Sequence, residues 1–134
     1  VITSKTLDGA NKIRSSDVNI CPPDEMIFDC GEKSVKKYFD VINLRKTIVW
    51  NGPLGVFEKE PFHLGTERLA KFIAKKTTDG FLNSVAGGGD TVAALNKFNL
   101  SHKISYVSTA GGAFLEWLEG KKLPGLEVLE KKLS

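Results

Sequence analysis

Residues 87–91 read Gly-Gly-Gly-Asp-Thr, which are the residue types and the spacing of a phosphate-binding turn. Residues 82–86 (Leu-Asn-Ser-Val-Ala) and 92–95 (Val-Ala-Ala-Leu) flank this run, so the pattern predicts a strand, a glycine turn and a helix. Glycines let backbone N–H groups approach a ligand, and these groups form an anion site together with the helix N-terminus. The predicted phosphate-binding residues are Gly87, Gly88, Gly89 and Thr91.

Asp90 places a carboxylate at the same turn. A carboxylate beside an anion site indicates a bridging cation, and Mg²⁺ on a nucleotide phosphate fits this chemistry. The hydroxyl of Thr91 could reach a phosphate oxygen or the metal's ligand shell. The alternative is a tight turn capped by Asp90 that binds nothing.

A second glycine-rich turn follows a short distance along the chain. Residues 104–107 predict a strand, 108–113 (Ser-Thr-Ala-Gly-Gly-Ala) a turn, and 114–119 a helix. Two such helix starts in one strand–helix pattern favour two walls of a phosphate-handling cleft.

The loop at 51–58 could hold a nucleoside. Gly52 and Gly55 let the backbone approach a flat ligand, while Leu54 and Val56 offer apolar surface. Pro53 and Phe57 are expected to stiffen and anchor the loop, and Glu58 could accept hydrogen bonds from sugar hydroxyls. A rigid structural turn is the alternative.

The elements that must position these loops alternate between strand and helix. We expect strands at 1–2, 18–20 and 47–50, helices starting at 34 and 65, and a terminal helix at 126–133. The alternation predicts an α/β fold, a parallel sheet with helices on both faces. Because ligands bind at the carboxyl ends of such strands, the three loops should line one rim.

Composition narrows the classes of partner. The chain has 134 residues, enough for one domain, and 19 basic against 16 acidic residues give a net charge of +3, too small to indicate nucleic-acid binding. No apolar run approaches the roughly 20 residues of a membrane helix, and no signal-peptide pattern is present. We therefore expect no nucleic-acid or membrane partner, and two free thiols, Cys21 and Cys30, in a cytoplasmic protein.

Four blocks of the chain resemble phosphoglycerate kinase in sequence and order. Residues 49–58 match the family's V-W-N-G-P-x-G-V-F-E, 87–91 its G-G-G-D-T, and 107–125 its V-S-T-G-G-G-A and L-E-x-L-E-G-K-x-L-P-G. Residues 29–34 are similar to its D-x-G-P-K-T. The resemblance implies phosphoryl transfer between ATP or ADP and 3-phosphoglycerate or 1,3-bisphosphoglycerate, with Mg²⁺ on the nucleotide and a Rossmann-like C-terminal domain in a two-domain kinase.

The resemblance also implies roles by position. Asp90 would bind Mg²⁺, Thr91 a phosphate, and Glu58 the ribose. The residues implied to line the adenosine pocket are Ile27, Phe28, Asn51, Pro53, Gly55 and Val56. Those implied to meet the transferring phosphoryl group are Thr109, Gly111 and Gly112. Phosphoryl transfer of this kind relies on positioning and charge stabilisation.

The chain departs from the family pattern at Ala110, where the family has glycine, and at Glu32, where it has proline. The family's G-S-K-V-x-x-K block and its phosphoglycerate-binding patch are absent from this sequence. We therefore expect a C-terminal fragment: 1–123 from the later part of the nucleotide-binding domain and 124–134 packing on an absent N-terminal domain, which would bind 3-phosphoglycerate.

Three expectations follow for such a fragment. The parent enzyme would be a monomer, whereas the fragment would be inactive and prone to self-association through exposed strand edges and helix faces. Either the fragment keeps weak nucleotide binding, or it is a folded piece that binds nothing.

Overall fold

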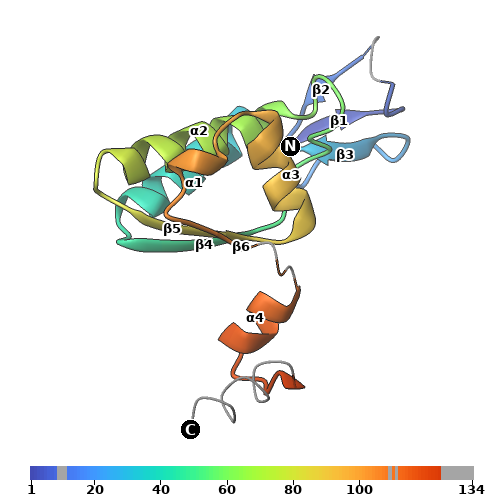
Figure 1. The fold of residues 1–134 in the computed structure, drawn as a ribbon. Helices are drawn as coiled ribbons and strands as arrows, with labels where there is room; N and C mark the ends of the chain where they lie inside the picture. The colour runs from blue at the N-terminus through green and yellow to red at the C-terminus, as the bar shows by residue number, and fades with distance from the viewer. Residues whose placement is uncertain (9–11, 109, 111, 125–134) are drawn as a thin grey trace, which may run out of the picture.

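The computed structural model describes residues 1–8, 12–108, 110 and 112–124 (Figure 1). Thr109, Gly111 and the terminal helix predicted at 126–133 lie outside these residues. The described part contains two three-stranded sheets, with helices on both faces of the larger one. No helix within it is long and apolar enough to cross a membrane.

The larger sheet is parallel and has the order β4-β5-β6. Its strands are β4 (Thr47–Asn51), β5 (Asn83–Gly87) and β6 (Tyr106–Ser108). Helix α2 (Leu64–Thr78) connects the first pair, and α3 (Gly89–Lys97) with the short 3-10 helix η1 (Ser101–Lys103) connects the second. This arrangement confirms the parallel α/β fold that the alternation of strands and helices predicts.

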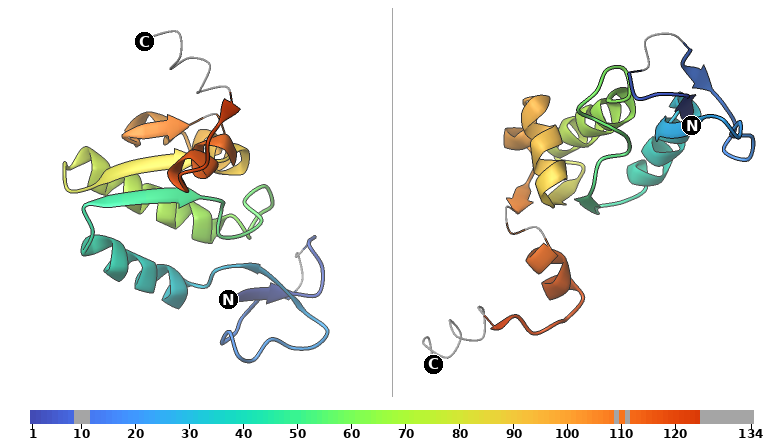
Figure 2. Two further views of the ribbon diagram at one scale, coloured as in Figure 1. Left: turned by 90° about the horizontal axis from the view of Figure 1, so that it is seen from below. Right: turned by 90° about the vertical axis from the view of Figure 1, so that its right-hand side faces the viewer.

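Helices lie on both faces of this sheet. Helix α1 (Glu32–Asn43), α2 and α3 cover one face, and α4 (Gly112–Leu118) lies on the other (Figures 1 and 2). Leu69 and Ile73 of α2 are buried in the core with Trp50 and Leu95. The ring of Phe39 on α1 stacks on that of Phe72 on α2 at 4.1 Å between centroids, so helical spacing correctly predicts both apolar faces.

A separate antiparallel sheet, which the sequence pattern does not predict, is formed by three short strands within the first 29 residues. Its order is β2-β1-β3, with β1 (Ile2–Ser4) between β2 (Arg14–Ser15) and β3 (Met26–Asp29). The prediction of a strand at 18–20 is wrong. The backbone N–H of Asn19 donates to the Asp17 carboxylate at 3.0 Å, and that of Ile20 to the Asp17 carbonyl at 3.0 Å, so a side-chain-stabilised turn forms instead.

The 134-residue chain by itself is expected to self-associate. Within the described residues, β4 and β6 each pair along one edge only, and Val49 and Tyr106 are 48% and 57% exposed. Unpaired edges and exposed apolar surface favour strand pairing between copies. Size-exclusion chromatography with light scattering should show dimers or larger species, or else a weak, non-cooperative melt. A single monomer mass at all concentrations with a cooperative melt would contradict this.

Candidate functional site

The carboxyl ends of the three parallel strands meet at one rim. The strand register pairs Asn51, the last residue of β4, with Gly87, the last of β5, and pairs Gly87 with Ser108, the last of β6. The 51–58 loop, the glycine turn at 87–89 and the start of the second glycine turn therefore begin side by side. The rim expected from the sequence is confirmed for the described residues.

The 51–58 loop and the glycine turn at 87–91 contact each other directly. The backbone N–H of Gly52 donates to Thr91 Oγ1 at 2.6 Å. A Cβ atom on Gly88 would lie 2.5 Å from Asn51 Oδ1, so the turn backbone passes close to that side chain. Thr91 is fully buried, and its predicted phosphate contact therefore requires this part of the turn to open.

The turn sets the N-terminus of α3 beside an accessible carboxylate. Gly88 has φ of +92°, a conformation that favours glycine, and α3 begins at Gly89. Asp90, in the first turn of α3, is exposed. Within the described residues no three His, Cys, Asp or Glu side chains gather into a metal-binding group. One carboxylate beside an anion site still fits Mg²⁺, which typically takes one or two carboxylates together with substrate phosphates.

Hydrogen bonds between side chains and the loop backbone hold the 51–58 loop in place. Trp50 Nε1 donates to the Gly52 carbonyl at 2.7 Å, and the Leu54 N–H donates to Thr66 Oγ1 on α2 at 3.1 Å. Phe57 is buried, as its predicted anchoring role requires. A loop whose backbone groups are satisfied in this way presents a preorganised surface to a ligand.

Lys97 is a tether that sequence reasoning missed. Its ammonium donates to the Phe57 carbonyl at 2.8 Å and to the Glu58 carbonyl at 3.3 Å. Lys97 ends α3, whose first turn carries Thr91, so this helix holds the loop at both of its ends. A lysine forty residues from its partner, at the end of a polar helix face, carries no sequence signal for this contact.

Strand β3 reaches the same loop. The Val56 N–H donates to the Phe28 carbonyl at 2.9 Å, and the Phe28 ring lies 4.8 Å from that of Phe62. Ile27 is 50% exposed on this strand. The structure thus brings Phe28 beside the predicted adenosine residues, and its contact with adenine stays a prediction.

The second glycine turn is described in part. The Ala110 N–H donates to Ser108 Oγ at 3.3 Å, and Gly112 begins α4. Thr109 and Gly111, two of the three residues predicted to meet the transferring phosphoryl group, are outside the described residues. Their placement at the rim stays a prediction.

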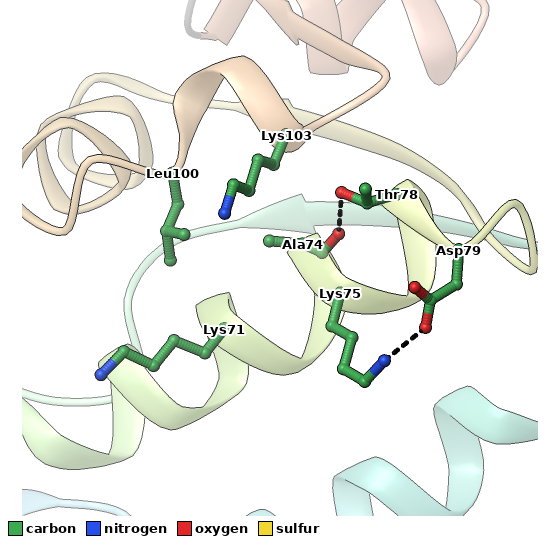
Figure 3. A pocket seen from close by; sticks show the side chains of 7 residues that line it. All are labelled: Lys71, Ala74, Lys75, Thr78, Asp79, Leu100 and Lys103. Carbon is green, nitrogen blue, oxygen red and sulfur yellow. Dashed lines mark hydrogen bonds and ion pairs between the residues drawn. The ribbon is translucent and has the colours of Figure 1, made fainter.

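A hollow of about 360 Å³ lies away from this rim, between α2 and η1 (Figure 3). Thr78 and Asp79 line it at the end of α2, just before β5 begins, so it lies near the amino end of β5. Lys75 in its wall pairs with Asp79 at 2.6 Å. None of the predicted site residues lines this hollow.

Comparisons with known proteins agree on one family. The family model described as phosphoglycerate kinase matches residues 1–121. Curated phosphoglycerate kinases from Chelativorans sp. (strain BNC1) and Zymomonas mobilis are 49% and 53% identical over 130 residues, which is 97% of this chain and 33% of each relative.

Solved structures give the same result. The phosphoglycerate kinase structure from Coxiella burnetii superposes with a TM-score of 0.88 at 46% identity, covering 100% of this chain and 33% of that one. The structure from Pyrococcus horikoshii OT3 has a TM-score of 0.68 at 39% identity over 79% of this chain. The chain spans about a third of the length of the relatives it matches.

Proposed function

The chain belongs to the phosphoglycerate kinase family, and from this premise we propose that it supplies the nucleotide-binding part of a glycolytic kinase. The proposed reaction is reversible phosphoryl transfer between ATP or ADP and 3-phosphoglycerate or 1,3-bisphosphoglycerate, in the cytoplasm. The observation that carries the proposal is the Gly52 N–H bond to Thr91 at 2.6 Å, because it joins a nucleoside-type loop to a phosphate-type turn.

The proposed nucleotide contacts come from two adjoining segments. Adenosine lies against the 51–58 loop, with Glu58 on the ribose hydroxyls and the side chains of Ile27 and Phe28 nearby. The backbone N–H groups at 87–89 bind the phosphates, and Thr91 reaches a phosphate once its part of the turn has opened. Support comes from the strand register, which sets Asn51 beside Gly87. Further adenosine contacts are proposed for Pro53, Gly55 and Val56.

Asp90 is the proposed Mg²⁺ ligand. Its exposed carboxylate next to the anion site suits an ion shared with phosphate oxygens. When bound with the nucleotide, Mg²⁺ supplies positive charge that offsets the charge on the phosphates. The residues of the chain then position the nucleotide and donate N–H groups to it.

The transferring phosphoryl group is proposed to meet the second glycine turn at Thr109, Gly111 and Gly112. Charge there is stabilised by backbone N–H groups, and no covalent nucleophile is required. The acceptor 3-phosphoglycerate is proposed to bind a part of the enzyme that this sequence does not include, and segment 124–134 to pack on that part. The chain by itself should then show no turnover in a coupled ATP assay.

Calorimetric titration with ADP, with and without Mg²⁺, tests the proposal. The chain should bind ADP weakly and more tightly with Mg²⁺, and Asp90→Asn should remove most of the gain from Mg²⁺ because the metal loses its protein ligand. Asp79→Asn is the matched control, since this exposed aspartate at the end of α2 lies at the opposite end of the strands.

Each outcome separates the alternatives. If Mg²⁺ strengthens ADP binding in the unmutated chain and in D79N, but not in D90N, the assignment of Asp90 as the Mg²⁺ ligand is supported. Binding with no Mg²⁺ dependence would remove Asp90 from the metal site. No detectable ADP binding would favour the alternative, a folded piece that binds no ligand.

A further inference from the structure

Asp29, the last residue of β3, is a buried carboxylate at a junction of three segments. It is 3% exposed, and within the described residues no ion pair is formed with it. Its Oδ1 accepts the Cys30 N–H at 2.8 Å, and its Oδ2 accepts the Gly65 N–H at 2.7 Å. Gly65 is the second residue of α2, so this carboxylate satisfies one of the unpaired donors at the start of the helix.

Burial and hydrogen bonding act on the pKa of Asp29 in opposite directions. Burial raises the pKa of the carboxyl group above its usual value, while the two N–H bonds and the more distant His63 and Arg68 act in the opposite direction. An ionised carboxylate away from water is costly unless its oxygens are satisfied. Both oxygens of Asp29 accept an N–H, which ties this buried carboxylate to Cys30 and to the start of α2.

Two glycines lie directly against the carboxylate. A Cβ atom on Gly55 or on Gly65 would collide with Asp29 Oδ1. Gly55 belongs to the 51–58 loop and Gly65 to α2, so Asp29 lies between the loop and the helix. Neither glycine position has room for a side-chain carbon. The next residue of the loop, Val56, is bonded through its N–H to the carbonyl of Phe28, the neighbour of Asp29.

We propose that Asp29 is a positioning residue for the nucleoside: its carboxylate fixes the Gly55 part of the loop against α2, so that Val56 and Glu58 face the ligand. The proposal rests on the assignment of the 51–58 loop to the nucleoside. The carboxylate acts through the backbone of the 51–58 loop and touches neither the nucleotide nor the glycine turn at 87–91. It should therefore affect binding of the nucleoside part of ADP much more than binding of the phosphates.

Asp29→Asn provides the test, because the two oxygens accept one N–H each. An asparagine can accept only one of these bonds and turns its NH₂ toward the other donor. Asp29→Ser, which lacks this donor–donor confrontation, is the second variant if D29N does not fold. Asp79→Asn is the matched control for the loss of one negative charge.

Two readouts are measured on the full chain. Amide hydrogen exchange at Val56 should accelerate about tenfold or more in D29N, while exchange in β5 stays unchanged. The dissociation constant for Mg-ADP should rise about tenfold or more, while that for Mg-pyrophosphate changes less than about threefold. The D79N control should change neither.

The proposal and its premise fail in different ways. If the unmutated 134-residue chain does not bind ADP, the assignment of a nucleotide site fails. Hydrogen exchange at Val56 then still decides whether Asp29 holds the loop. Unchanged exchange at Val56 in a folded Asp29 variant would overturn the proposal. Equal weakening of ADP and pyrophosphate would also overturn it, because Asp29 would then support stability in general.

Discussion

Gly55→Ala should lower the free energy of unfolding by about 3 kcal/mol, because it forces a methyl group into a filled junction. The added Cβ would collide with Asp29 Oδ1 and lie 2.6 Å from the Phe28 carbonyl oxygen. Neither neighbour can move cheaply, since Asp29 is held by two N–H groups and the Phe28 carbonyl accepts the Val56 N–H. Gly55 has no positive φ, so the effect is steric alone.

Urea unfolding followed by tryptophan fluorescence measures this change. Trp50 of β4 is 6% exposed and donates to Gly52 in the 51–58 loop, so its emission reports on the loop and the core together. Gly89→Ala is the control: nothing lies within 4 Å of its Cβ position, and its φ is not positive. If the free energy of unfolding of G55A lies within about 0.5 kcal/mol of that of the unmutated chain, with an unchanged denaturant slope, the close packing of Gly55 against Asp29 and Phe28 is contradicted.

The larger part of the fold follows from short-range patterns. Helical spacing predicts the buried faces of α1 and α2 because Val35, Leu69 and Ile73 must leave water together. The rim follows because parallel strands end on one edge, as the Asn51–Gly87 register confirms. The antiparallel sheet does not follow, since its two-residue strand β2 is too short and too exposed to leave a periodic signal.

In the candidate site, too, some features could be predicted from the sequence and others could not. Its glycine turns and Asp90 are visible in the sequence because their chemistry is local. The tethers of the loop are not: Thr66, Lys97 and Asp29 contact it from 12 to 40 residues away or through glycines that have no side chain. Contacts of this kind depend on packing between elements, which a pattern along the chain does not contain.

Gly88→Ala should cost about tenfold or more in Mg-ADP affinity, because it disturbs the turn in two ways. Alanine at φ of +92° is strained by about 1–2 kcal/mol, and its Cβ would lie 2.5 Å from Asn51 Oδ1. That amide oxygen is the end of a flexible side chain, so Asn51 moves and the backbone yields less. The result is a displaced residue in the proposed adenosine pocket.

Alanine replacements at two nearby glycines distinguish the effect of backbone strain from the effect of displacing Asn51. Gly52 has the same φ of +92° with nothing within 4 Å of its Cβ position, so Gly52→Ala adds strain without a collision. Gly89→Ala adds neither. Both replacements keep the backbone N–H groups, so affinity for Mg-ADP should fall most in G88A, less in G52A and least in G89A, whereas stability should fall similarly in the first two. Equal affinities in G88A and G52A would mean that Asn51 does not contact the nucleotide, because only G88A displaces it.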